Sequence, residues 1–512
     1  MPIPDANVRK MSGSVFGWLV TIQAMCFESS PSGADKLNRD GVSRKRVARR
    51  KGPNVRVLLA AIGAIAMVST ASAQEQPSQP LTLVQAIDLA RANYPSLQEV
   101  RARANAAGEG VGVARSAYLP RVDVMWQLNR ATRNNVFGLI LPQAIVPPIS
   151  GPVLGTTSYE SVWGTAGGVL LSWQAVDFGL RKAQVAAARA QSSLATAQTA
   201  LTELDVSAAA ADAFLGVLAS DELVRAARAN VDRLQTLAES VRTLVRNQLR
   251  PGADESRADA ESAIARNQLS QAVQTATIAR AALADAIGSA GAPGTIGIGP
   301  LAQLPSWPEN PASIDSHPAV RVAAASVETV RARERALGHA YAPHMDVQSA
   351  FSGRGSGAEI PGQGSRGDGL TLQVPNWAVG VTVSFSALDL FSINARKRVE
   401  AQNELAERAK RDQAIQNVTA QQARARALIT AATEIAQNTP TELKAASDAD
   451  SRARARYASG LANVTEVAEA ARLLAQAEAD DALARLGVWR AFLAVAQAAG
   501  DLTPFLERIR QP

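Results

Sequence analysis

The second half of this chain repeats the first half. The heptapeptide YLPRVDV at residues 118–124 returns as YAPHMDV at residues 341–347, 223 positions later. The pattern S-[WF]-x-A-x-D at residues 172–177 returns at residues 384–389, 212 positions later. The single change of spacing places an 11-residue length difference in the loop between the two motifs. A period this long indicates one duplicated domain and not an array of short repeats.

The positive charge of the chain is confined to its N-terminal segment. The formal net charge is +7, and residues 1–56 alone hold eleven Lys or Arg and four Asp or Glu. The remaining residues are therefore neutral overall. They lack the basic footprint of a nucleic-acid-binding domain, so we expect no nucleic-acid partner.

Residues 1–73 are predicted to be an N-terminal extension that ends in a secretory signal peptide. A basic cluster leads into an apolar stretch at residues 57–68 and then into an Ala-Ser-Ala tripeptide. This order predicts cleavage between Ala73 and Gln74. A transmembrane anchor is the alternative, but the apolar run is shorter than the ~20 residues that a spanning helix needs. The only cysteine, Cys26, would be removed, so the mature chain is expected to hold neither a disulfide nor a lipid-bearing thiol.

Long alanine-rich segments predict one helical hairpin in each half. Residues 177–249 contain no proline, and residues 391–460 contain only Pro440. At 1.5 Å per residue, such helices approach ~100 Å, far beyond the helices of ordinary globular domains. Each segment ends at a break that contains glycine and is followed by a second helical segment. The abundance of alanine predicts close packing between the helices.

Two windows in each half alternate apolar and polar residues with the period of a β-strand. The apolar row contains aromatic residues near its ends, which is typical of strands with one face in lipid and the other in water. We assign Trp126, Leu128, Trp377, Val379 and Val381 to the lipid face. The opposite, lumenal face is assigned Asp123, Gln127, Asp346 and Gln348. A soluble hairpin packed on the helices is the alternative interpretation.

Four strands are too few to close a membrane barrel. A sheet that spans a bilayer has no open edge, and about eight strands is the minimum for closure. Insertion of these strands into a membrane would therefore require several chains to share one barrel.

These features predict an internally duplicated, mixed α+β membrane protein. The first repeat spans residues 74–290, with strands near 118–131 and 160–174 and a helical hairpin near 177–288 whose tip lies near 247–254. A linker follows at 291–313. The second repeat spans residues 314–500, with strands near 341–352 and 376–387 and a hairpin near 391–498 whose tip lies near 458–465; residues 501–512 form a C-terminal tail.

The order of these elements resembles that of the TolC family of outer-membrane efflux proteins, over about residues 81–500. Three motifs carry the resemblance: L-x-x-A followed by N-x-P at residues 83–95, W-x-x-x-D-x-G at residues 173–179, and Y-x-x-G-L-A-N-V-T-E-V-x-E-A at residues 457–470. The first tip departs from the family pattern, because Gln248 replaces the family glycine, with Pro251 and Gly252 following.

The resemblance implies a homotrimer with a twelve-stranded β-barrel in the outer membrane, four strands per chain, continued by a twelve-helix periplasmic α-barrel. It implies an exit duct without catalysis or cofactor, serving a tripartite efflux pump or a type I secretion system. The partners implied are outer-membrane lipid, a periplasmic adaptor (membrane fusion) protein and an inner-membrane pump of the RND, ABC or MFS class.

The resemblance also implies functional residues at the two tips. Glu466 and Glu469 match an acidic ring at the periplasmic aperture, and Tyr457 with Asp254 matches a latch in which the tyrosine bonds to the acid. Many members carry an arginine where this chain has Ala462, and Arg250 of the other hairpin is a candidate substitute. Adaptor contacts are expected at Gln248, Leu249, Arg250, Gly460, Leu461 and Val464.

Two other classes of function fit the sequence less well. An enzyme or metal site would draw on His317, His339 and His344. His317 occupies the turn that repeats Tyr94 and is expected to be structural, and no His-Glu-x-x-His frame surrounds the other two. A periplasmic or surface coiled coil without a channel would account for the helices, but it leaves the alternating strands unexplained.

Overall fold

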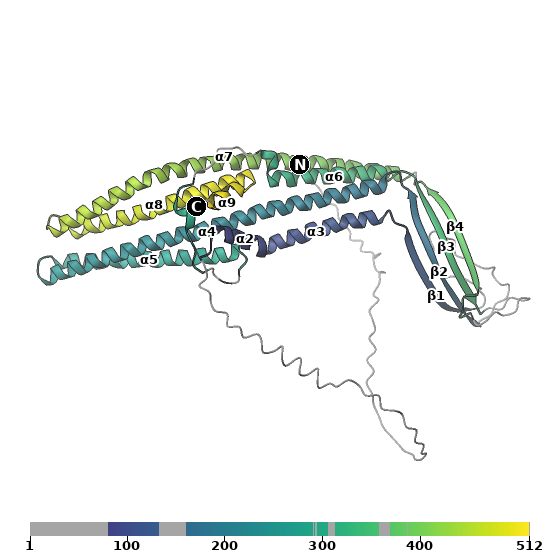
Figure 1. Ribbon diagram of the computed structural model, residues 1–512, viewed down its shortest axis with the longest axis horizontal. Coiled ribbons are helices and arrows are strands. Elements are labelled where there is room, and N and C mark those ends of the chain that lie inside the picture. Colours follow the sequence, from purple (N-terminus) through teal and green to yellow (C-terminus); the bar gives the residue numbers. More distant parts are fainter. Residues whose placement is uncertain are drawn as a thin grey trace, which may run out of the picture. The chain divides into compact units, whose positions relative to one another are not determined.

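Figure 1 shows the computed structural model of the chain, which describes residues 80–132, 160–289, 291, 294–305, 313–357, 369–386 and 388–510. The predicted signal peptide, its cleavage site at Ala73 and Gln74, and Cys26 lie outside the described residues. Within the described ranges, no helix has both the length and the apolar character needed to cross a bilayer.

Four antiparallel strands form one sheet in the order β1-β2-β3-β4. The strands are β1 (Arg121–Thr132), β2 (Ser161–Val176), β3 (His344–Ser356) and β4 (Val374–Ser384). Each half of the chain contributes one pair, and the pairing of β2 with β3 joins the two halves. β1 and β4 are the two edges of the sheet within the chain.

The strand ends differ by a few residues from those predicted. β1 and β3 begin just after Pro120 and Pro343, because proline has no N–H to donate to a ladder. β2 continues to Val176 through an irregularity in the pairing between Gln174 and Val176. β4 begins at Val374 and ends at Ser384, and Pro375 is accommodated because β4 is an edge strand.

Four helices connect directly to the four strands, and all four adjoin the same end of the sheet (Figure 1). Helix α3 (Pro95–Ser116) leads into β1, α4 (Leu180–Arg246) follows β2, α6 (Pro318–His339) leads into β3, and α7 (Asp389–Ala458) follows β4. The long helices turn back as α5 (Gly252–Ala286), which packs on α4, and α8 (Val464–Ala499), which packs on α7. The remaining elements are α2 (Leu83–Asn93), the short 3-10 helices η1 (Gly299–Ala302) and η2 (Ile314–Ser316), and α9 (Thr503–Arg510).

The duplication extends to the helix ends. Tyr94 and His317 are the N-caps of α3 and α6, and each is followed by a proline at the first helical position, where the missing N–H costs nothing. Gly288 and Gly500 lie 212 positions apart and have φ of 65° and 81°, which favours glycine after a helix.

The apolar core is divided into separate clusters along the helices. The largest lies where α2, α4, α8 and α9 meet, around Phe214, Trp489 and Phe505. A second cluster lies near the hairpin tips, around Val241 and Val467. Many of the buried positions are alanine, which permits close approach of the helices.

The segment predicted to be a C-terminal tail folds instead as α9. Phe505, Leu506 and Ile509 recur at helical spacing and are buried against the main cluster. The Phe505 ring lies 6.1 Å from the Trp489 ring, edge to face. Because α9 is only eight residues long, its pattern is easily mistaken for a polar terminus.

Candidate functional site

The sheet has one apolar face and one polar face. Trp126, Leu128, Trp377, Val379 and Val381, all assigned to the lipid face from the sequence, are exposed. On the opposite face, Asp123, Gln127 and Asp346 are half-buried and Gln348 is 8% exposed. The register agrees with this division, because residues directly opposite in an antiparallel pair share a face. Phe351 lies opposite Val169 and Trp377, and Val347 lies opposite Val381.

Exposed aromatic residues gather at the sheet. Among the described residues, every exposed aromatic side chain belongs to a strand or lies within seven residues of a strand end: Tyr118, Trp126, Trp163, Trp173, Phe178, Tyr341, Phe351, Trp377, Phe385 and Phe391. Aromatic residues of the helical core, such as Phe214 and Trp489, are buried. An exposed apolar face with aromatic residues toward its ends is the surface that a bilayer-spanning sheet presents to lipid.

The two hairpin tips have the same backbone geometry, 212 positions apart. Gln248 and Gly460 are both left-handed, with φ of 58° and 79°. In each tip the next residue, Leu249 or Leu461, donates its N–H to the carbonyl five positions earlier, at 2.9 and 2.8 Å. This is the pattern of a Schellman ending. Gln248 therefore takes the place of the family glycine, while Gly252 is an ordinary helical residue at the start of α5.

Five of the six predicted adaptor-contact residues lie at the surface of the tips. Leu249 and Leu461 are both well exposed, Leu461 at 72%. Gln248 and Gly460 are exposed, and Arg250 is half-buried. Val464 is different, because its side chain is 2% exposed and packs in the tip core with Val467. Val464 packs in a cluster with residues of the first hairpin, so its side chain is not on the exposed surface where an adaptor could contact it.

Arg250 of the first tip reaches the second tip. Its guanidinium lies over the Tyr457 ring, 4.8 Å from the ring centre, where a cation is attracted by the aromatic face. One guanidinium nitrogen also approaches the carbonyl oxygens of Tyr457 and Ala462, both at 3.4 Å. These carbonyls lie at the end of α7 and in the turn, where a cation complements the helix dipole.

The structure does not contain a hydrogen bond between Tyr457 and Asp254. The Tyr457 hydroxyl is buried and has no hydrogen-bond partner within the described part of the chain. Burial raises the pKa of Tyr457, an effect opposed by Arg250 and assisted by Asp254. The two residues predicted to form the latch are therefore near neighbours, but the contact made in this chain is the one between Arg250 and the ring.

Glu466 and Glu469 lie exposed on the first turns of α8. The Asn463 side chain accepts the Glu466 N–H at 2.9 Å and so caps the helix. Each carboxylate has an arginine nearby: Arg456 lies 3.4 Å from Glu466, and Arg472 lies 3.7 Å from Glu469. Arginine partners at these positions were not expected from the sequence motif alone, and they offset part of the negative charge.

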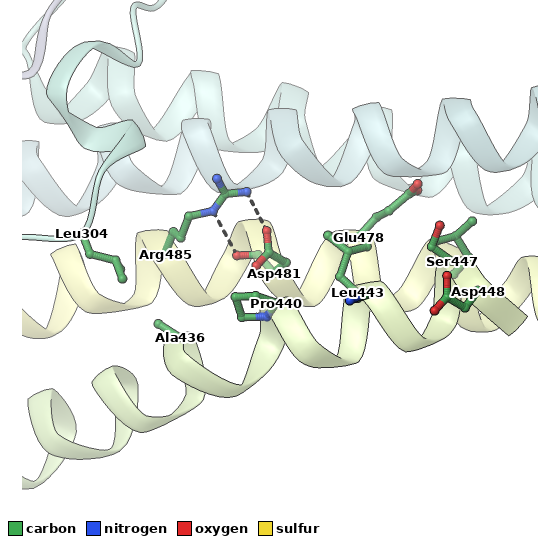
Figure 2. Close-up of a pocket in the computed structure, with 11 residues that line it drawn as sticks. Leu304, Ala436, Pro440, Leu443, Ser447, Asp448, Glu478, Asp481 and Arg485 are labelled. Atoms are coloured by element: carbon green, nitrogen blue, oxygen red, sulfur yellow. Dashed lines mark hydrogen bonds and ion pairs between the residues drawn. The ribbon is translucent and has the colours of Figure 1, made fainter.

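A groove of about 660 Å³ lies beside Pro440, between α7 and α8 (Figure 2). Pro440 has no N–H for the carbonyl four residues earlier, so the ladder of α7 is interrupted there. Arg485 donates to Asp481 at 2.8 Å, and Asp481 also accepts from the Thr439 hydroxyl at 3.3 Å. Glu478 is held by both terminal nitrogens of Arg233, each at 2.8 Å. Three charged side chains of the groove, Glu478, Asp481 and Arg485, are therefore engaged in ion pairs within the chain.

Each of the three histidines makes a separate contact in the structure. Within the described ranges, no group of three or more His, Cys, Asp or Glu side chains is arranged to hold a metal ion. His317 is buried as the N-cap of α6, as its position in the repeated turn predicts. His339 lies 3.1 Å from the Phe178 carbonyl, and His344 lies 3.6 Å from Asp346.

The chain matches the outer membrane efflux protein family over residues 86–289 and 311–501. Its fold is similar to that of the outer-membrane channel OprN, at 20% identity over 82% of this chain and 89% of that one, with a TM-score of 0.66. It is also similar to the Campylobacter jejuni outer membrane channel CmeC (14% identity, 82% and 85%, TM-score 0.65) and to the open state of the Neisseria gonorrhoeae channel MtrE (18%, 82% and 89%, TM-score 0.65). No curated protein matches its sequence.

An exposed apolar sheet joined to long helical hairpins defines a membrane conduit of the TolC type. The chain belongs to the outer membrane efflux protein family. It is accordingly an outer-membrane exit duct for tripartite efflux and not an enzyme, and it extends from the outer membrane into the periplasm.

Proposed function

We propose that three copies of this chain form the duct, with twelve strands in the membrane and twelve long helices in the periplasm. The observation that carries the proposal is the pair of open sheet edges, β1 and β4, on a sheet whose outward face is apolar. Unpaired backbone groups at such edges are costly in a bilayer, and closure against another copy satisfies them. A sheet of four strands per chain reaches a common barrel size with three chains.

The same proposal assigns the periplasmic end of the duct to the two hairpin tips. Leu249 and Leu461 would dock a periplasmic adaptor, which connects the duct to an inner-membrane pump of the RND, ABC or MFS class or to a type I secretion system. In support, both leucines are exposed and occupy equivalent positions in the two repeats. Glu466 and Glu469 would surround the aperture, and the contact of Arg250 with the Tyr457 ring, near Asp254, would hold the tips together.

Oligomeric state tests the first part of the proposal. The protein extracted from outer membranes without boiling should have three times the mass of the chain by light scattering corrected for detergent. It should migrate as a single chain after boiling. A monomer or dimer of full channel conductance would contradict the trimer.

Site-specific photo-crosslinking tests the docking surface. A photoreactive residue at Leu249 or Leu461 should capture an adaptor in cells, whereas the same residue at the exposed Val113, on α3, should not. Capture from Val113 and not from either leucine would place the adaptor elsewhere on the duct.

A further inference from the structure

The helical region is charged very differently at its two ends. The ten residues nearest the sheet in α3, α4, α6 and α7 (107–116, 180–189, 330–339 and 389–398) hold ten Arg or Lys and three Asp or Glu. The ten residues nearest the tips in α4, α5, α7 and α8 (237–246, 252–261, 449–458 and 464–473) hold seven Arg or Lys and eight Asp or Glu. The positive excess therefore lies beside the sheet.

Most of the bases beside the sheet lack a partner. Within the described ranges, neither an ion pair nor a side-chain hydrogen bond engages six of the ten, which we call the basic collar: Arg115, Lys182, Arg189, Arg396, Lys397 and Arg398. The other four are engaged, for example Arg181 with Asp177 at 2.9 Å and Arg331 with Glu404 at 2.6 Å. At the tip end, bases such as Arg242 and Arg454 have carboxylates at 2.8 and 2.7 Å.

The basic collar begins just past the exposed apolar face of the sheet and the aromatic residues at its end. Phe178 and Leu388 lie just past the strands, and Phe391, in the first turn of α7, is 76% exposed. Arg396 follows five residues later, which is ~7.5 Å along a helix. The headgroup layer of each leaflet is about 5–8 Å thick. Long basic side chains keep their stems on apolar surface and extend their charge toward such a layer.

We propose that the basic collar binds the phosphate groups of anionic phospholipids in the periplasmic leaflet of the outer membrane. Unpaired positive charge at headgroup depth, or just beyond it on long flexible side chains, is complementary to these lipids and to their surface potential. The inference rests on the outer-membrane location of the sheet. It does not depend on the trimer or on the identity of the pump.

Tryptophan fluorescence can test this proposal, because Trp126, Trp173 and Trp377 are exposed on the strands. The full-length protein is reconstituted in mixtures of brominated phosphatidylglycerol and brominated phosphatidylcholine, which quench tryptophans that they contact. We expect the wild-type protein to favour phosphatidylglycerol by about threefold or more, and 1 M NaCl to abolish the preference. The variant Arg396→Gln/Lys397→Gln/Arg398→Gln should lose most of it.

A matched control removes the same charge at the other end of the helices. Arg246, Arg257 and Arg452 are exposed near the tips and have no ionic partner among the described residues. Replacing these three with glutamine should leave the lipid preference unchanged. Equal loss in both variants, or a wild-type preference that survives 1 M NaCl, would overturn the proposal. So would a collar variant that keeps its lipid preference and shifts ion selectivity toward cations, because the collar would then line the duct.

Discussion

At the scale of single residues, Arg250 marks a difference between the two repeats that links their hairpin tips. Its equivalent 212 positions later is Ala462, and the arginine of the first tip contacts the backbone of the second tip beside this alanine. The small Ala462 side chain is buried, and its carbonyl lies 3.4 Å from the Arg250 guanidinium. The aromatic partner differs between the repeats as well, because the residue equivalent to Tyr457 in the first repeat is Val245.

The structure predicts that Arg250, and not the Tyr457 hydroxyl, restrains the tips. Arg250→Gln and Tyr457→Leu should raise the resting conductance in planar bilayers by about twofold or more, because each removes a cation–aromatic contact between hairpins. Tyr457→Phe should have little effect, since the hydroxyl has no partner in the described structure. The control is Arg246→Gln, in the last turn of α4. If Tyr457→Phe alone opens the channel, the bond to Asp254 implied by the family resemblance is the functional latch.

The charges near the aperture predict opposite effects for acids and bases. Glu466→Ala with Glu469→Ala should lower the cation preference of the open channel and weaken block by trivalent metal ions. Arg456→Ala with Arg472→Ala should raise both, because it frees the two carboxylates. We expect changes of about twofold or more in the permeability ratio at low salt. Unchanged selectivity in both variants would assign these residues to the outer surface.

At the scale of elements, the two faces of β4 can be separated by neighbouring residues. Val381 is 61% exposed on the apolar face, and Thr382 is exposed on the polar face opposite Asp346. Gln348, the polar position considered from the sequence, is a poorer comparison because it is almost buried. Val381 and Thr382 are adjacent in β4, so they lie at nearly the same depth and differ in the face of the sheet that they occupy.

Arginine at these two positions should therefore have unequal effects. Val381→Arg should destabilise the membrane-inserted state by about 2–4 kcal/mol if it lies near the bilayer midplane. Thr382→Arg should cost much less, since the new base faces water and Asp346. Urea denaturation of the protein in lipid vesicles measures both. Equal destabilisation by Val381→Arg and Thr382→Arg would mean that the two faces of β4 do not face lipid and lumen, respectively.

The elements that sequence reasoning anticipated are those with a long and repeated pattern. The period-2 rows of the strands and the helices of 67 and 70 residues, which contain only one proline, each carry many concordant signals. Residues whose role depends on a distant neighbour were harder to anticipate. Val464 belongs to an exposed motif in sequence, yet it is buried because the first hairpin covers it. The eight residues of α9 carry too few periods to stand out, and no local pattern pairs Arg250 with Tyr457.

At the scale of the whole molecule, a polar cluster around the buried His317 joins α4, α6 and α8. The His317 ring accepts the Ala319 N–H through Nδ1 at 3.1 Å and donates through Nε2 to the Gln497 carbonyl at 3.2 Å. The Gln497 side chain is hydrogen-bonded to Asp205 of α4. Both ring nitrogens are therefore committed in the neutral form of His317, and a proton would remove the cap at the start of α6.

This cluster predicts how stability depends on pH. Burial lowers the pKa of His317 below its ordinary value of 6.5, so the folded state resists a proton that the unfolded chain accepts. Stability should therefore fall as the pH drops below about 6.5. Partial desolvation raises the pKa of the Asp205 carboxyl above its ordinary value of 3.8. Its contribution to the stability of the fold therefore has the opposite sign and increases as the pH falls.

The two contributions can be separated by thermal unfolding in detergent, followed by circular dichroism at pH 7.5 and 5.5. His317→Asn keeps an oxygen that can accept the Ala319 N–H and cannot be protonated in this range. It should lose the decrease in Tm that the wild-type protein shows at pH 5.5. Asp205→Asn removes the opposing contribution, so its Tm should fall more steeply than that of the wild type when the pH is lowered further, toward the range in which the Asp205 carboxyl takes up its proton. His339→Asn, at the end of α6, should behave like the wild type, because that ring lies exposed against the Phe178 carbonyl. A Tm that falls equally in the wild type and His317→Asn would show that acid sensitivity arises elsewhere in the duct.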